Sequence, residues 1–194
     1  MSRAPTSALC SIQFSIVRSL VVLLAASYCA FAPVVAGEPL VHHTFSFDAR
    51  RDSPDAVILD YRYGNSKIPA ARADPVKVAK GRIRQQVGIT GEMLRPEFLY
   101  VKWRIRSTDQ IHEQDVDLRN RLPAVLTNHI VTFFVKNSEL YVYVIAPEPR
   151  DPGACPSRDV RRKLLESPMP AEKVLGMYCS RKATLVFPDA PKIE

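Results

Sequence analysis

Apolar and polar residues alternate along much of the chain after residue 40, with the two-residue period of half-buried β-strands. Residues 41–47 and 57–63 alternate on either side of the turn-like segment ARRDSPD, and this arrangement predicts a first hairpin. One face of the first strand carries Val41, His43, Phe45 and Phe47, and the second strand alternates through Val57, Leu59, Tyr61 and Tyr63.

A second hairpin is predicted from residues 98–106 and 111–118, with its turn centred on residues 108 and 109. In this register, opposite charges meet on one face and apolar residues match on the other, so a slip of one residue would lose both. The charged face is therefore expected to be exposed to solvent, and the apolar face is expected to pack in the core. The expected pairs are Arg104–Glu113, Lys102–Asp115 and Tyr100–Asp117 on the polar face, and Trp103–Gln114, Val101–Val116 and Leu99–Leu118 on the core face.

A third hairpin is predicted from residues 129–136 and 139–145, joined by Asn137-Ser138. Both faces of these strands are apolar, so they should be central and covered on both sides. The expected pairs on one face are Val131–Val144, Phe133–Val142 and Val135–Leu140, and those on the other are Ile130–Ile145, Thr132–Tyr143 and Phe134–Tyr141.

A last strand is predicted over residues 183–187, and two segments resemble short helices. The dipeptide Asp74-Pro75 is typical of a helix start, but the valines that follow it equally suit an extended segment. Residues 157–166 carry a serine cap, an early aspartate and an apolar stripe before Pro168. Together these segments predict a mainly β protein, an antiparallel sandwich or half-barrel of about seven strands built from hairpins, with one or two short helices.

The first 36 residues differ from the rest, because they combine a basic start without acids and a largely apolar stretch over residues 19–36. This pattern predicts a secretory signal peptide cleaved after Ala36. An uncleaved anchor and lipidation at Cys29 are the alternatives. Each of the three leaves residues 37–194 as a single β-rich domain outside the cytosol, either periplasmic or secreted, or membrane-anchored and facing the periplasm.

The positions of the cysteines are consistent with export. Cys10 and Cys29 fall in the leader, which leaves Cys155 and Cys179 as a pair in the mature chain. In an oxidising compartment these two should form a disulfide that ties the proline-rich excursion of residues 147–180. A bridge over such a loop contributes on the order of 3 kcal/mol to stability.

Composition and charge narrow the possible functions. With 46% hydrophobic and 24% charged residues, the 194-residue chain is neither disordered nor fibrous, and it suits one domain. The net charge is +7, of which the leader supplies +2, so the remainder has only a mild basic excess. Such an excess is too small to indicate a nucleic-acid-binding protein.

No motif for catalysis, cofactor binding or metal binding is present. The chain has no nucleophile elbow, HExxH sequence, phosphate loop or EF-hand spacing. Glu113, Asp115 and Asp117 could be a calcium ladder, but strand carboxylates two residues apart are roughly 6–7 Å from each other, too far for one ion. We therefore interpret them as a solvated face paired with basic residues, and we expect no catalytic residue, metal or cofactor.

The strongest candidate for a binding surface is a basic cluster. Lys77, Lys80, Arg82 and Arg84 fall within eight residues, and they are either a contact surface for an acidic partner or simply a solvated face. Lys102 and Arg104, on the polar face of the second hairpin, are expected to extend this surface. The partner would be an acidic protein or envelope component, and the membrane would be contacted only through the N-terminal segment.

Three blocks within residues 45–146 carry a resemblance: FSFDARRDSPDAVILDYRYG, EFLYVKWRIRSTDQIHEQDVDLRNRLP and HIVTFFVKNSELYVYVI. They look like a group of small uncharacterised exported or lipid-anchored proteins of proteobacteria. The resemblance implies export and transfers no residue role. Some proteins similar in size and export are immunity partners of toxins, so a protein-binding module that occludes a toxin is the leading expectation. A small cell-envelope hydrolase and a structural envelope factor are the alternatives.

Overall fold

The computed structural model describes residues 39–149 and 155–189. The chain divides into two units between Gly37 and Glu38, and the described residues all belong to the second. The predicted leader, residues 1–36, lies outside the described residues.

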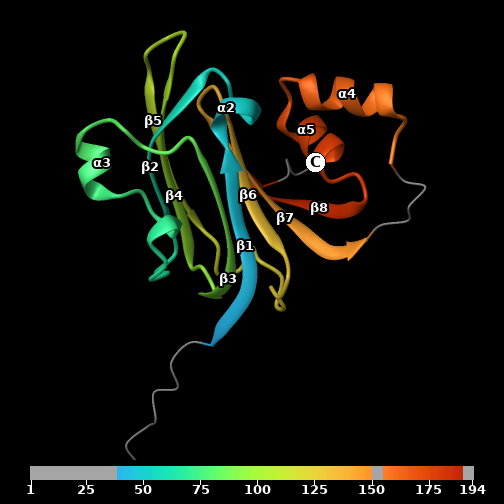
Figure 1. The fold of residues 1–194 in the computed structure, drawn as a ribbon, viewed down its shortest axis with the longest axis horizontal. Helices are drawn as coiled ribbons and strands as arrows, with labels where there is room; N and C mark the ends of the chain where they lie inside the picture. The colour runs from blue at the N-terminus through green and yellow to red at the C-terminus, as the bar shows by residue number, and fades with distance from the viewer. Residues whose placement is uncertain (1–38, 150–154, 190–194) are drawn as a thin grey trace, which may run out of the picture. The chain divides into compact units, whose positions relative to one another are not determined.

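The described chain is mainly β, with two sheets and several short helices (Figure 1). The strands are β1 (Leu40–Asp48), β2 (Ala56–Tyr63), β3 (Gln86–Leu94), β4 (Phe98–Ile105), β5 (Ile111–Asp117), β6 (Ile130–Lys136), β7 (Glu139–Pro149) and β8 (Arg181–Phe187). The helices are α2 (Ala49–Asp52), α3 (Pro75–Ala79), α4 (Arg158–Glu166), α5 (Pro170–Met177) and the 3-10 turn η2 (Pro69–Ala71).

The two sheets have the orders β3-β1-β6-β7-β8 and β2-β4-β5. This arrangement confirms the predicted sandwich-like β fold, and the described strands do not close into a barrel. The larger sheet is mixed because β1 pairs with β6 in parallel, whereas a wholly antiparallel fold was expected. β3 is an additional strand that the sequence did not indicate, since Gly88 and Gly91 interrupt its apolar pattern.

The core lies between the two sheets. Phe45 of β1 stacks on Tyr63 of β2 with ring centroids 4.2 Å apart, and Phe47 meets the edge of Tyr61 at 5.0 Å. Trp103 of β4 is only 1% exposed, which confirms that it belongs to the core. Its indole N–H donates to the backbone oxygen of Asn137, 2.8 Å away in the turn between β6 and β7. The indole therefore joins the two sheets.

The predicted first hairpin is wrong, although both of its strands exist. β1 pairs with β3 and β6, and β2 pairs with β4 in the other sheet. The four-residue helix α2 lies between the two strands and directs the chain from one sheet to the other. A β-bulge between Ile58 and Asp60 also changes the inward face, so Ala56 and Ile58 are buried in place of Val57 and Leu59.

The other two hairpins exist, with one register confirmed and one corrected. All the predicted pairs of β6 and β7 are present. In β4–β5 each residue keeps its face but pairs two positions away from the prediction, so Lys102 opposes Glu113. The cause is a tertiary contact: the backbone N–H and hydroxyl of Ser107 donate to the Asp55 carboxylate at 3.0 and 2.6 Å. This contact fixes a four-residue loop, which starts after Ile105 and shifts the turn.

The C-terminal excursion is a helical pair closed by the predicted disulfide between Cys155 and Cys179, whose Cα atoms are 4.9 Å apart. α4 agrees with the predicted helix, whereas α5 was not expected in the proline-rich excursion; it begins at Pro170, which lies in the first turn, where proline is tolerated. Val174 of α5 packs with Phe134, Tyr143 and Ile145 on the outer face of β6 and β7. These central strands are therefore covered on both sides, as predicted.

His42 and His43 point to opposite faces of β1, and only His43 is fully buried. The His43 ring bonds the Val41 backbone oxygen through Nδ1 at 2.8 Å, while Nε2 has no partner among the described residues. Burial lowers the pKa of His43. The charges of Glu92 and Arg95 have smaller effects on this pKa, which the first raises and the second lowers. The folded protein thus favours neutral His43.

We expect acid to destabilise the fold through His43. In the unfolded chain His43 binds a proton near pH 6.5, and in the folded chain it does so only at lower pH. The full free energy of unfolding is therefore present above pH 6.5, and it falls as pH decreases toward the folded pKa. The loss within that window is at most about 1.4 kcal/mol per pH unit. Denaturant unfolding from about pH 7.5 to about pH 5.5 should show a weaker pH dependence in His43→Phe than in the exposed control His42→Gln. Equal dependence in both variants would contradict this role.

Candidate binding site

The free edge of β2 is covered by the chain segment that leads into α3 (Figure 1). The backbone N–H of Ala73 donates to the Tyr61 oxygen at 2.9 Å, and Arg62 and Arg72 form an isolated antiparallel bridge. The segment thus behaves as an irregular extra strand. It places the residues that follow it beside the smaller sheet.

The Gln85 side chain fixes the other end of this segment. Its amide oxygen accepts from the Ile58 N–H at 2.8 Å, and its amide nitrogen donates to the Ile58 oxygen at 2.9 Å. β2 is an edge strand, so its backbone groups that face away from β4 have no neighbouring strand, and the amide takes the place of one. Both ends of the segment are therefore held against β2.

Between these anchors lies the surface that we call the basic arm (residues 72–84). Asp74 begins α3 by accepting from the Val76 N–H at 2.9 Å, and Gly81 ends the turn at a φ of +62°. Val78 and Ile83 pack against the core, which leaves the charged residues exposed. Those residues are Arg72, Lys77, Lys80, Arg82 and Arg84, with Asp74 as the single acid.

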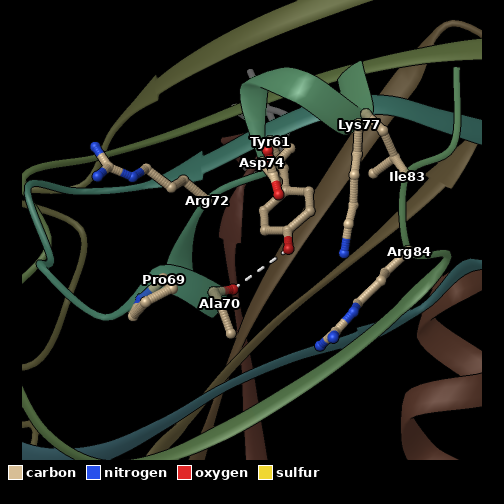
Figure 2. A pocket seen from close by; sticks show the side chains of 9 residues that line it. Tyr61, Pro69, Ala70, Arg72, Asp74, Lys77, Ile83 and Arg84 are labelled. Carbon is tan, nitrogen blue, oxygen red and sulfur yellow. Dashed lines mark hydrogen bonds between the residues drawn. The ribbon is translucent and has the colours of Figure 1, made fainter. Parts of the chain in front are cut away.

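The basic arm borders a cavity of about 180 Å³. Figure 2 shows that Lys77 and Arg84 extend toward the side of the cavity where the Tyr61 hydroxyl lies, whereas Arg72 extends away from them. Pro69, Ala70 and Ile83 add apolar surface to the lining. Two cations therefore face a small cavity that also has apolar walls.

Tyr61 brings a neutral hydroxyl to this cavity. Its side chain is 3% exposed, and burial raises its pKa, an effect that the nearby Arg84 charge partly opposes. The hydroxyl donates to the Ala70 oxygen over a long distance of 3.3 Å. Tyr61 is consequently a hydrogen-bond donor at neutral pH.

The six predicted binding residues fall into separate groups. Lys77 and Arg84 line the cavity, while Lys80 and Arg82 belong to the same arm but not to the lining. Among the described residues, no ion pair involves any of the five basic side chains of the arm. The arm's positive charge is therefore not compensated locally.

Lys102 and Arg104 differ, because both carry an acidic neighbour. The Lys102 ammonium lies 3.2 Å from the Glu113 carboxylate, and the Arg104 guanidinium lies 3.4 Å from that of Asp109. Lys102 also lines a second cavity of about 320 Å³, which shares Ile83 with the first. Lys102 thus adjoins the arm, whereas Arg104 lines neither cavity.

Two of the three carboxylates of β5, those of Glu113 and Asp117, are engaged with cations. Hydrogen bonds from Lys102 and Tyr100 lower the pKa of Glu113, and hydrogen bonds from Arg119 lower that of Asp117 to about 2. No group of histidine, cysteine, aspartate or glutamate side chains in the described residues is arranged to hold a metal ion. Of the described helices, none is both long and apolar enough to cross a membrane.

The lining of the cavity combines basic, hydroxyl and carboxylate side chains with apolar ones. It contains no histidine, serine or cysteine, and its one carboxylate, Asp74, is engaged in capping α3. Sequence reasoning identified Lys77 and Arg84 from their charge but did not identify Tyr61, Arg72 or Asp74 as their neighbours. Arg72 could have been included with the basic run, while the position of Tyr61 depends on tertiary structure.

In comparisons with known proteins, no family model matches the chain, and no curated protein or solved structure matches it either.

Proposed function

We propose that this protein is an extracytoplasmic protein-binding module whose basic arm recognises an acidic protein partner. The observation that carries the proposal is the uncompensated charge of the arm, in which five basic residues accompany one acid. Complementary charge on a partner would steer association and select against other partners.

The manner in which the arm is held also supports this function. Gln85 bonds both backbone groups of Ile58, and Ala73 bonds the Tyr61 oxygen, so the arm is attached to the sheet edge at both ends. A surface that is ordered before binding loses less conformational entropy on association. The arm therefore resembles a preformed recognition surface more than a disordered basic tail.

The proposed location is the periplasm or the exterior of the cell. The Cys155–Cys179 disulfide is compatible with an oxidising compartment, and the leader pattern over residues 1–36 is typical of export. In such a setting we propose the role of an immunity protein, which neutralises a toxin by covering an acidic surface on it.

Removal of the arm's charge should weaken partner binding. We expect the variant Lys77→Ser/Lys80→Ser/Arg82→Ser/Arg84→Ser to bind the partner about tenfold or more weakly, because exposed ion pairs contribute about 0.2–1 kcal/mol each. The salt dependence of binding should flatten at the same time. Affinity capture from envelope extract with mass spectrometry would identify the partner, and calorimetry at several salt concentrations would give the affinity.

A matched control removes the same charge elsewhere. Arg106, Arg158, Lys163 and Lys182 are exposed and lie outside the arm, so their joint replacement by serine should leave the affinity close to that of the unmodified protein. An equal loss in both variants would show that net charge alone attracts the partner. An unchanged affinity in the arm variant would contradict the proposed function.

A further inference from the structure

The cavity beside the basic arm is too small for a typical organic ligand. Its volume of about 180 Å³ is below the range of about 300–1,000 Å³ that small-molecule sites usually occupy. The cavity is thus suited to the end of one side chain that projects from a protein partner.

The chemistry of the lining favours a short acidic side chain. Lys77 and Arg84 reach the cavity from one side, and Tyr61 contributes a hydroxyl whose present hydrogen bond to Ala70 is long at 3.3 Å. A carboxylate would accept from all three groups, and charge-assisted hydrogen bonds are stronger than neutral ones. The apolar walls, which include Ile83, would contact the methylene groups of the same side chain.

A phosphate group fits this cavity less well than a carboxylate. Phosphate sites commonly present several free backbone N–H groups at the start of a helix or in a nest. Here the Asp74 side chain accepts from the N–H of Val76, and the Asp74 backbone oxygen accepts from those of Lys77 and Val78. The backbone donors of α3 are therefore already occupied.

We propose that this cavity receives one aspartate or glutamate side chain of the acidic partner, bound by Lys77, Arg84 and Tyr61. This inference rests on the proposed function and adds a specific anchor to it. Lys80 and Arg82 then serve only long-range attraction. The two pairs of basic residues carry the same charge but have different roles.

The test uses the purified protein and a small probe. N-acetyl-L-glutamate N-methylamide, which carries one free side-chain carboxylate, is titrated while the NMR signals of Arg84 and Tyr61 are recorded. We expect saturable shifts with a dissociation constant of about 1 mM or weaker. The neutral glutamine analogue should give no such shifts, and inorganic phosphate should bind more weakly than the glutamate probe.

Two variants that lose the same charge distinguish binding of the carboxylate in the cavity from long-range electrostatic attraction. Lys77→Gln/Arg84→Gln should weaken probe binding about tenfold, as followed through the Tyr61 signals, whereas Lys80→Gln/Arg82→Gln should change it less than about twofold. Equal losses, equal binding of the glutamine analogue or tighter binding of phosphate would overturn the inference.

If the partner is captured through the arm but the glutamate probe does not bind, the carboxylate anchor fails and the proposed function stands. If the probe binds but no partner depends on the arm, the proposed function fails instead.

Discussion

Replacement of Trp103 by alanine is expected to lower the free energy of unfolding by about 3–5 kcal/mol. Trp103 is the largest of the fully buried side chains, and its indole N–H donates to Asn137 across the two sheets. The substitution removes this contact and leaves a cavity between the sheets. Guanidinium unfolding followed by circular dichroism measures the change. Tryptophan fluorescence cannot be used, because Trp103 is the only tryptophan and the variant lacks it.

Two controls define what the Trp103 experiment shows. Trp103→Phe keeps much of the buried surface but removes the N–H donor, so its cost should be clearly smaller than that of the alanine variant. Val125→Ala should change stability little, because Val125 is 69% exposed. A cost for Trp103→Ala as small as that of Val125→Ala would contradict the assignment of the indole to the core.

Loss of the disulfide is the second large effect that we expect. The double variant Cys155→Ser/Cys179→Ser should be about 3 kcal/mol less stable, because the bridge closes a loop over a sequence separation of 24. Reductant should lower the denaturation midpoint of the unmodified protein similarly and leave the variant unchanged.

The location of this loss follows from the contacts of α5. Val174 packs on the outer face of β6 and β7, and the buried Lys173 donates to the Arg51 backbone oxygen at 3.0 Å. Without the bridge, we expect hydrogen exchange to rise first in α4 and α5 and only later in β6. Uniform loss of protection across the larger sheet would contradict a role restricted to the excursion.

The sequence predicted those parts of the fold that local patterns control. The β6–β7 register is correct because the two-residue turn starting at Asn137, at a φ of +53°, permits only one pairing between two apolar strands. In β4–β5 the alternation fixed the faces, but Asp55 binds Ser107 and shifts the turn. A contact between residues so distant in sequence has no local pattern.

The candidate site shows the same division between local and tertiary information. Lys77 and Arg84 could be identified from charge density alone, and Asp74-Pro75 indicated the helix that carries Lys77. The cavity could not be predicted, because its lining joins Tyr61 of β2 to residues of the segment 69–84, and tertiary hydrogen bonds hold that segment against the strand. The ion pairs of Lys102 and Arg104 likewise depend on the shifted register and on Asp109.

The parallel pairing of β1 with β6 has a consequence for the order of folding. Thr44 pairs with Ile130, so β1 lacks one neighbour until nearly two thirds of the chain is available. The β6–β7 hairpin closes locally, on a scale of about 1–10 μs. Closure of the β1–β6 pair has to overcome the entropy of a long loop, so we expect it to limit the rate at which the native state forms.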